Sequence, residues 1–378
     1  MNDCITHSKP HYQILDGLRG VAALMVICYH VCEGFATSPV DQNFNHGYLA
    51  VDFFFALSGF VIGYAYDDRW DKGLTSGKFL LRRLTRLHPM VILAALTGAA
   101  TFAIQGFTKW DGTVVGVWNV AMALLLTMLM IPAWPGAPHE VRGNGEMFPL
   151  NGPSWSLFFE YIGNLLYMLL LRRMSTKALA TLTAVLGAAY ASLDVINISG
   201  CYNMGLGWTL ADNNLIGGFV RMMFSFSAGM LLSRIFKPLR VKRTFWLCSL
   251  LIVVLLSMPY VGSRTNEPSV LNAIYECACV LVAFPLIVYL GASGQTSGRR
   301  TGAICKFLGD ISFPLYIIHY PFMYLFYNWL WSGERTTAAI VAAIAILVPA
   351  CIAAAYAALR LYDIPVRARL TRMWNNMP

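Results

Sequence analysis

Charged residues are scarce in this chain. Asp, Glu, Lys and Arg together make up 12% of its 378 residues, about half the share of an ordinary soluble domain, whereas 57% of the residues are hydrophobic. Long apolar stretches recur from one end of the chain to the other, and none of the intervening parts has the composition of a soluble domain. The composition therefore excludes a soluble globular protein and predicts one membrane domain over residues 1–378.

The sequence also lacks the marks of a signal peptide, an internal repeat or a metal site. Its polar start, residues 1–13, leads into a helix that carries Asp16 and Arg19, so it has no uninterrupted apolar core. No repeat relates the two halves, although many transporters have one. Nine cysteines are scattered along the chain. Cys277 and Cys279 are two residues apart, so on a helix their side chains point to different faces. We expect buried thiols and no metal ligands.

Transmembrane helices need about 20 mostly apolar residues. Eleven segments qualify, at residues 14–34, 48–66, 89–105, 115–131, 155–171, 178–193, 216–235, 244–260, 270–290, 308–331 and 337–359. Cytosolic loops of membrane proteins are enriched in Lys and Arg. The most basic segments of this chain are 78–86, 172–177, 234–243, 299–306 and the tail from residue 360 onward.

These basic segments predict the topology. If all eleven apolar segments crossed, the loop at 172–177 and every later basic loop would lie outside the cytosol. If segment 115–131 does not cross fully, all five basic segments lie in the cytosol together. We therefore predict an all-α bundle of about ten transmembrane helices in the cell (inner) membrane, with cytosolic tails at about 1–13 and 360–378. Segment 115–131 is then re-entrant or interfacial, and a tilted eleventh transmembrane helix is the alternative. The net charge of +9 follows this distribution and requires no nucleic-acid partner.

Two pairs of residues are interpreted as structural. Gly59 and Gly63 form a small-xxx-small pair in the second apolar segment, which predicts close packing of that helix against another. Arg221 and Glu276 are ionisable groups inside apolar segments, and we expect them to form a structural ion pair rather than to act in catalysis.

Ionisable side chains inside apolar segments are functional candidates. The first segment holds Asp16, Arg19, His30 and Glu33. Arg19 and His30 are eleven residues apart, which brings them to one face of a helix with about 16 Å between them along the axis. This arrangement suits a channel for a phosphorylated donor. The cation near the surface would bind the donor, and the titratable imidazole lies deeper in the bundle. The alternative is an arginine that reaches the interface and a histidine bonded to a neighbouring carbonyl.

Further polar residues in the apolar segments strengthen the functional interpretation: Asp52, Ser58, Glu160, Asn164 and His319. Glu160 and Asn164 are four residues apart and share a helix face. Asp52 begins its segment from the outer side, so we expect it near His30, where a carboxylate would raise the basicity of the imidazole and fix its tautomer.

An arginine cluster precedes the third apolar segment. Arg82, Arg83 and Arg86 stand just before Pro89. Ordinary positive-inside charge explains such a cluster, but three guanidinium groups at a cytosolic mouth also match the phosphates of coenzyme A.

Five segments in order resemble the signature of the membrane acyltransferase-3 family. They are Leu15–Gly20 followed by His30, Val51–Phe60, Arg82–Pro89, Pro153–Leu157 with Glu160, and Leu308–His319. Each is weak alone, whereas the ordered set is specific. One departure is Asp363 before Pro365, where the family usually has a glutamate. We expect no hydrolase-like domain after residue 378, so the chain resembles the stand-alone form of the family.

The resemblance implies a ten-span acyltransferase that modifies exported carbohydrates, or in some members antibiotics or lipids. It implies that Arg19 and His30 are functional, with His30 as the catalytic base. Arg83 and Arg86 would contact the donor. Asp52, Glu160 and His319 are expected to belong to the catalytic site.

We expect acyl-coenzyme A, with acetyl as the acyl group, to act as a co-substrate and no cofactor to be bound permanently. Its phosphates would bind Arg82, Arg83 and Arg86, while His30, aided by Asp52, takes a proton from the hydroxyl of a carbohydrate or glycolipid. Ser58 is expected to contact substrate.

The donor of hydrogen bonds to the oxyanion is expected among Ser154, Trp155 and Ser156, without a choice between them. A covalent acyl-serine intermediate stays open. The alternative from another class is a secondary transporter or flippase that uses the buried charges as a substrate or proton path. A structural membrane subunit is the third alternative, disfavoured by so many buried charges.

Overall fold

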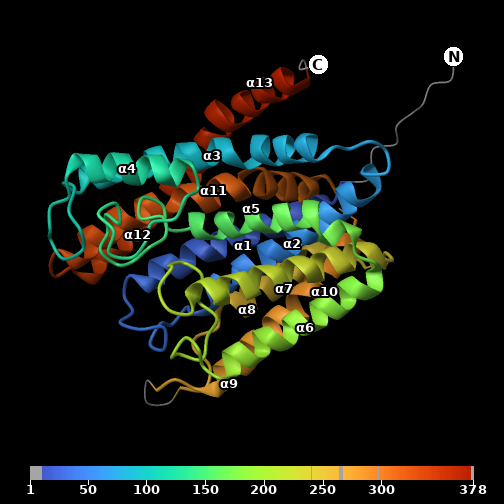
Figure 1. Ribbon diagram of the computed structural model, residues 1–378. Coiled ribbons are helices and arrows are strands. Elements are labelled where there is room, and N and C mark those ends of the chain that lie inside the picture. Colours follow the sequence, from blue (N-terminus) through green and yellow to red (C-terminus); the bar gives the residue numbers. More distant parts are fainter. Residues whose placement is uncertain (1–10, 240, 264–266, 296–297, 376–378) are drawn as a thin grey trace.

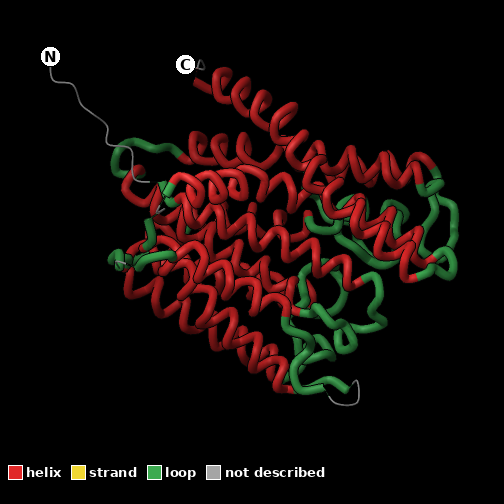
Figure 2. Tube along the Cα trace, turned by 180° about the vertical axis from the view of Figure 1, so that it is seen from behind, coloured by secondary structure: helices red, strands yellow, loops and turns green. Residues whose placement is uncertain are grey.

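The computed structural model describes residues 11–239, 241–263, 267–295 and 298–375. These residues form helices and loops (Figures 1 and 2), with two isolated backbone bridges and no β-strand among them. The all-α prediction is therefore confirmed for the described residues. The helices are α1 Gln13–Glu33, α2 Ala50–Tyr66, α3 Ser76–Ile104, α4 Val117–Met128, α5 Ser154–Leu169, α6 Thr176–Val195, α7 Asn214–Ile235, α8 Thr244–Ser257, α9 Val270–Cys277, α10 Phe284–Ser293, α11 Arg299–Trp331, α12 Thr337–Ala358 and α13 Ile364–Asn375.

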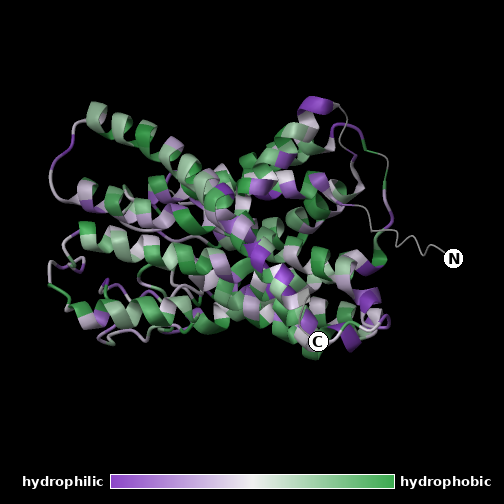
Figure 3. Cartoon of the chain, turned by 90° about the horizontal axis from the view of Figure 1, so that it is seen from above, coloured by the Kyte–Doolittle hydropathy of each residue, from purple (hydrophilic) through white to green (hydrophobic). Residues whose placement is uncertain are grey.

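Among the described residues, nine helical stretches are long and apolar enough to cross a membrane. Helices α4 and α8 are apolar but shorter, with 12 and 14 residues. Hydrophobic residues prevail along the helices (Figure 3). The stretch Thr337–Trp374 has a mean hydropathy of 2.6 over its most apolar window, of which only 11% is buried inside the protein. An apolar helix that packs on so little protein has lipid as its natural neighbour, so these helices indicate a membrane protein.

The connections between helices divide into two ends. At one end, Arg234 Nε lies 2.8 Å from Asp67 Oδ2, and Gln13 Nε2 donates to Gly302 O at 3.0 Å. This end carries the basic connections and is called the basic end below. At the other, His46 Nδ1 lies 2.8 Å from the Met258 carbonyl. The longer loops gather at this distal end (Figure 2).

The chain between α3 and α5, which includes α4, makes no net crossing between the two ends. Helix α3 leaves the basic end, and the residue after its last turn, Gln105, donates from Nε2 to the carbonyl of Tyr324 at 2.9 Å. Just before α5, the backbone N–H of Gly152 donates to the hydroxyl of the same tyrosine at 3.2 Å. The chain between α3 and α5 thus begins and ends near the same level of the bundle. The behaviour of segment 115–131 in a membrane and the count of ten transmembrane helices stay predictions.

Two helices extend beyond the apolar segments that the sequence defined. Helix α3 begins at Ser76, not near residue 89, because Thr75 caps it by accepting the Lys78 N–H at 3.3 Å and because Leu and Arg favour helix. Arg82, Arg83 and Arg86 are therefore helical, and the helix continues through Pro89. The tail after residue 360 also forms a helix, α13, that packs on α3. Residues 1–10 and 376–378 of the expected tails lie outside the described residues.

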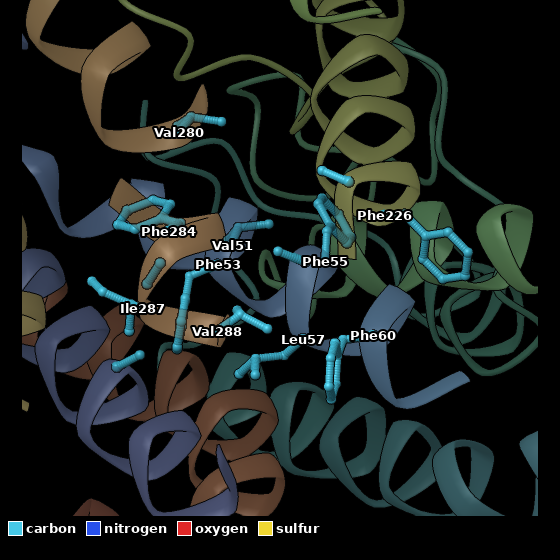
Figure 4. Packing of buried hydrophobic residues seen from close by; sticks show 14 of the residues in the cluster. Val51, Phe53, Phe55, Leu57, Phe60, Phe226, Val280, Phe284, Ile287 and Val288 are labelled. Atoms are coloured by element: carbon cyan, nitrogen blue, oxygen red, sulfur yellow. The ribbon is translucent and has the colours of Figure 1, made fainter. Parts of the chain in front are cut away.

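Small residues allow the closest helix crossings. A Cβ on Gly59 of α2 would overlap the Phe226 carbonyl of α7, and one on Gly63 would overlap the Ser233 hydroxyl. The predicted packing role of this glycine pair is confirmed, and large apolar side chains fill the space around α2, α7 and α10 (Figure 4). Helices α1 and α11 approach in the same way, because a Cβ on Gly20 would overlap the Leu308 carbonyl. This crossing packs α1 closely against α11.

Candidate active site

A narrow cavity of about 80 Å³, the arginine cavity, lies on the basic-end side of the bundle. Its polar lining consists of Arg19 from α1, Ser58 from α2, Arg83 and Arg86 from α3, Ser156 and Glu160 from α5, and Ser312 and Tyr316 from α11. Glu160 Oε1 accepts a hydrogen bond from Arg83 Nη2 at 2.8 Å and another from Ser58 Oγ at 2.9 Å. The sequence-predicted residues Arg19, Ser58, Arg83, Arg86 and Glu160 thus come together here.

The arginine cavity has a surplus of positive charge. Arg19 is bonded to Asp16 on its own helix, with 3.3 Å between Nη1 and Oδ1, and Arg83 is bonded to Glu160. Arg86 has no carboxylate partner among the described residues. The buried Nε of Arg83 also lacks a hydrogen-bond partner there. These free guanidinium donors suit an anionic ligand.

A larger cavity of about 330 Å³, the histidine cavity, opens toward the distal end. It is lined by His30 and Glu33 of α1, Trp155 of α5, Tyr320 of α11, and Glu146 of the loop before α5. Val51 and Tyr316 line both this cavity and the arginine cavity, so the two adjoin. Arg19 opens on one and His30 on the other, as expected from two positions about 16 Å apart along one helix face.

Glu33 orients the imidazole of His30. The distance between His30 Nδ1 and Glu33 Oε2 is 2.7 Å, and the two residues are three apart on α1. The hydroxyl of Tyr327 donates to the same carboxylate oxygen at 3.0 Å. A carboxylate only accepts, so Nδ1 carries a proton and Nε2 keeps its lone pair, which is the tautomer of a general base.

Asp52 does not take the place expected for it beside His30. It is fully buried and bonded to Arg221 of α7, with 2.6 Å between Oδ2 and Nη2. Arg221 also donates to the carbonyls of Leu206 at 2.7 Å and Tyr48 at 3.2 Å. The expectation that Asp52 assists His30 is therefore wrong in its geometry, because helix α2 turns Asp52 toward α7.

Glu276 does not pair with Arg221 as the sequence suggested. It accepts hydrogen bonds from the hydroxyl of Tyr48, from Asn272 Nδ2 at 2.7 Å and from the Met204 N–H at 2.8 Å. Arg221 nevertheless belongs to a structural ion pair, in which Asp52 is its partner.

His319 lies behind His30. Their ring centroids are 5.4 Å apart, and His319 Nδ1 bonds to the Leu315 carbonyl at 3.1 Å. His319 Nε2 is buried without a partner among the described residues, and the ring is not part of the histidine-cavity lining. Tyr320 is on that lining, with its ring 4.7 Å from His30. Of these two imidazoles, only that of His30 lines the histidine cavity.

The residues that begin α5 contribute side chains rather than free backbone donors. The N–H groups of Ser154, Trp155 and Ser156 bond to the carbonyls of residues 151–153. Ser156 Oγ donates to the Pro153 carbonyl at 3.0 Å and lies 2.7 Å from the Tyr316 hydroxyl. Ser154 Oγ is buried and has no partner in the described part of the chain. Of the three, Trp155 lines the histidine cavity and Ser156 lines the arginine cavity, so the choice of an oxyanion donor stays a prediction.

The arginine cluster is divided between two faces of α3. Arg83 is buried in the arginine cavity, whereas Arg82 is exposed and lines a separate pocket between α3 and α13. Arg86 lines both. The sequence suggested that the three guanidinium groups form one site. The structure instead divides them between two cavities.

Glu146 is a residue of the site that sequence reasoning missed. It lies in the loop before α5, accepts hydrogen bonds from the Tyr324 hydroxyl and from Asn144 Nδ2 (2.8 Å), and lines the histidine cavity. Burial raises its pKa to about 7. No spacing rule marks a loop glutamate, whereas the partnership of Glu33 with His30 follows from their i,i+3 spacing. In the described residues, no three His, Cys, Asp or Glu side chains come together as metal ligands.

Comparison with known proteins decides the class of this site. The profile of the acyltransferase domain family, acyltransferase-3, matches residues 12–359. The chain belongs to this family. It is an acyltransferase, and the matched interval contains both cavities but ends before α13. No solved structure matches the chain.

Curated relatives agree with this assignment. "Acyltransferase MdmB" of Streptomyces mycarofaciens is 27% identical over 328 residues, which is 81% of this chain and 77% of that protein. "Protein 2 in picA locus" of Rhizobium radiobacter is 38% identical over 171 residues, 43% of this chain and 84% of that protein. A provisionally named O-acetyltransferase of Staphylococcus aureus (strain COL) is 40% identical over 96 residues, 24% of this chain and 14% of its own length.

Proposed function

We propose that this acyltransferase moves an acyl group, acetyl in the first instance, from cytosolic acyl-coenzyme A to a hydroxyl of a cell-surface or exported carbohydrate. The observation that carries the proposal is the Glu33-oriented imidazole of His30 on the lining of the histidine cavity, which adjoins the arginine cavity at Val51 and Tyr316. A donor that enters from the basic end meets an acceptor from the distal end at this junction. The word O-acetyltransferase in the name of the Staphylococcus aureus relative supports the acetyl group.

Transfer is direct in this mechanism. The acceptor hydroxyl gives its proton to His30 Nε2 while its oxygen bonds to the carbonyl carbon of the thioester. The C–S bond then breaks, and the coenzyme A thiolate takes the proton back from His30. General-base help of this kind is worth roughly a hundred- to ten-thousandfold in rate. No serine among the described residues is hydrogen-bonded to His30 or His319, so nothing there activates a serine as an acyl carrier.

The donor end of the proposal rests on charge and shape. Arg19, Arg83 and Arg86 offer more positive charge than Glu160 and Asp16 neutralise. Guanidinium groups bind phosphate through paired N–H donors. The arginine cavity is narrow, which suits the slender pantetheine arm that leads from the phosphates to the thioester.

The acceptor end has the lining of a sugar site. Aromatic rings and uncharged or acidic hydrogen-bonding groups surround the histidine cavity: Tyr29, Tyr48, Trp155, Trp208 and Tyr320, with Glu33, Asn144, Glu146 and Asn203. Its one guanidinium, Arg221, already has a partner on each nitrogen, from Asp52 and two carbonyls. A neutral polyhydroxylated ring fits such a cavity better than an anionic sugar, because carboxylates accept hydrogen bonds from hydroxyls and repel negative charge.

The orientation in the cell (inner) membrane follows from the positive-inside rule. The connections rich in Lys and Arg meet at the basic end, so this end and both termini are assigned to the cytosol. In a cysteine-free background, an exposed cysteine replacing Ser175 should resist an impermeant thiol reagent in intact cells, and one replacing Asp212 should react. Labelling at position 175 from outside would reject the assignment.

Acceptor-dependent release of coenzyme A tests the function itself. Detergent-purified protein is mixed with acetyl-coenzyme A and a panel of neutral oligosaccharides, and the free thiol is measured with the acetylated product. We expect thiol release only with an acceptor. Transport of the sugar by reconstituted protein without any thiol release would instead establish the transporter or flippase alternative.

A further inference from the structure

A third pocket lies at the basic end, between α3 and the C-terminal helix α13. It is lined by Lys78, Arg82, Thr85 and Arg86 of α3 and by Arg367, Thr371 and Trp374 of α13. On each helix these residues recur at intervals of three or four and share one face. Helix α13 lies above α3 in Figure 1, and it falls outside residues 12–359 that match the family profile.

The pocket combines free cations with a fixed aromatic ring. The side chains of Lys78, Arg82 and Arg86 have no acidic partner among the described residues. Arg367 has one, Asp363, at the long distance of 3.4 Å. Trp374 Nε1 donates to Thr85 Oγ1 at 3.0 Å, and this bond holds the indole at the edge of the pocket. A phosphorylated aromatic ligand satisfies both features.

Size separates this pocket from the arginine cavity. The pocket has a volume of about 490 Å³, within the range of roughly 300–1,000 Å³ that is typical of small-molecule sites. The arginine cavity, at about 80 Å³, is too small for a nucleotide. Arg86 lines both, so the pocket lies at the mouth of the narrower cavity.

The geometry points to this pocket as the nucleotide subsite of the donor, an inference that rests on the proposed use of acyl-coenzyme A. The diphosphate joins the adenosine to the pantetheine arm, so it belongs at Arg86, the residue shared by both spaces. The ribose 3′-phosphate then lies among Lys78, Arg82 and Arg367, and the adenine stacks on Trp374. Helix α13 therefore supplies a part of the donor site that the family match does not include.

A cycle of ligands and variants tests this subsite. The affinities of coenzyme A, 3′-dephospho-coenzyme A and pantetheine are measured by calorimetry in a nonionic detergent. We expect Arg367→Ala to weaken coenzyme A roughly tenfold and to leave the dephospho form almost unchanged. Trp374→Leu should weaken both nucleotides roughly tenfold, with recovery in Trp374→Phe and no effect on pantetheine. Arg369→Ala removes the same charge from another face of α13 and should match the wild type.

The outcomes separate this inference from the function on which it rests. If wild-type protein binds no coenzyme A, the donor proposal fails. If it binds coenzyme A and both Arg367→Ala and Trp374→Leu keep wild-type affinity, the nucleotide subsite is overturned and the donor proposal stands. An anionic lipid headgroup offers the same phosphate chemistry. Loss of phosphatidylglycerol binding in Arg367→Ala, with coenzyme A affinity intact, would assign the pocket to lipid and overturn the subsite.

Discussion

The arginine cavity and the histidine cavity each contain an arginine bonded to a carboxylate, and the two arginines are held in opposite ways. Arg221 is 1% exposed, and each of its three side-chain nitrogens donates to Asp52 or to a carbonyl oxygen. Arg83 is bonded to Glu160 through one nitrogen, and its buried Nε has no partner among the described residues. A guanidinium whose nitrogens all have partners stabilises the bundle, whereas one with an unpaired nitrogen is free to bind a ligand.

This difference assigns opposite chemistry to the two cavities. The arginine cavity keeps free positive donors for an anion. The histidine cavity has its arginine neutralised and presents carboxylates, amides and aromatic rings, with one oriented imidazole among them. Tyr316 and Val51 line both cavities, so the two environments adjoin at these residues.

The largest expected effect tests the imidazole. His30→Gln keeps the polar volume but removes the base, so transfer should fall by roughly a hundred- to ten-thousandfold. Donor affinity should persist, because Arg19 lies about 16 Å from His30 along the axis of α1. Transfer rate and acetyl-coenzyme A affinity are measured on the same monodisperse preparation. Near wild-type transfer would remove His30 from the mechanism and direct attention to His319.

The second prediction contrasts the two ion pairs through stability. Asp52→Asn leaves the buried Arg221 charge without its partner, which typically costs about 3–5 kcal/mol. Glu160→Gln should cost less, because Arg83 borders a cavity through which water can reach its charge. Thermal unfolding in detergent measures both variants. Equal destabilisation would contradict the distinction between an arginine whose nitrogens all have partners and one with an unpaired nitrogen.

The third prediction concerns donor affinity. Arg83→Ala and Arg86→Ala each remove a charged hydrogen-bond donor from the proposed donor site, and such a contact is worth about 1.5–3 kcal/mol, or roughly ten- to a hundredfold in affinity. Arg173→Ala, an exposed change at the same end of the bundle, is the matched control. Affinities for acetyl-coenzyme A that match the wild type in both cavity variants would reduce these arginines to ordinary positive-inside charge.

Sequence reasoning located the helices and selected two residues of α1, Arg19 and His30, that line cavities, because hydropathy and helical spacing are local properties. It also foresaw the glycine contact of Gly59. It failed for Asp52, since spacing along one helix says nothing about how far another helix is rotated. Glu33, three residues from His30, is the partner that local geometry alone could have identified.

The predicted helix boundaries were wrong for a different reason. An apolar segment ends where charged residues begin, whereas the helix continues, because Leu and Arg are both good helix formers. The start of α3 at Ser76 and the existence of α13 follow from this. The pairing of Trp374 with Thr85 joins residues 289 apart in sequence, and a single sequence gives no signal for such a contact.

The smallest expected effect is the pH dependence of stability that Glu146 confers. It contrasts this carboxylate of the distal loop with the guanidinium groups of the arginine cavity. Burial raises its pKa to about 7 from the ordinary 4.5. The folded protein therefore holds this proton more tightly than the unfolded chain. The resulting stabilisation is complete below about pH 4.5 and is lost as pH rises through about 7. Between pH 6 and 8 the loss is about 1.4 kcal/mol, from the constant of 1.36 kcal/mol per pKa unit.

Thermal unfolding measures this effect. The melting temperature should fall from pH 6 to pH 8 in the wild type, and its slope against pH should flatten in Glu146→Gln. Asp111→Asn is the control, because hydrogen bonds from Thr113 lower the pKa of that exposed carboxyl, so its loss should leave the slope unchanged. An equal slope in wild type and Glu146→Gln would show that Glu146 keeps its charge through this range, and the histidine cavity would then be more strongly anionic than its burial implies.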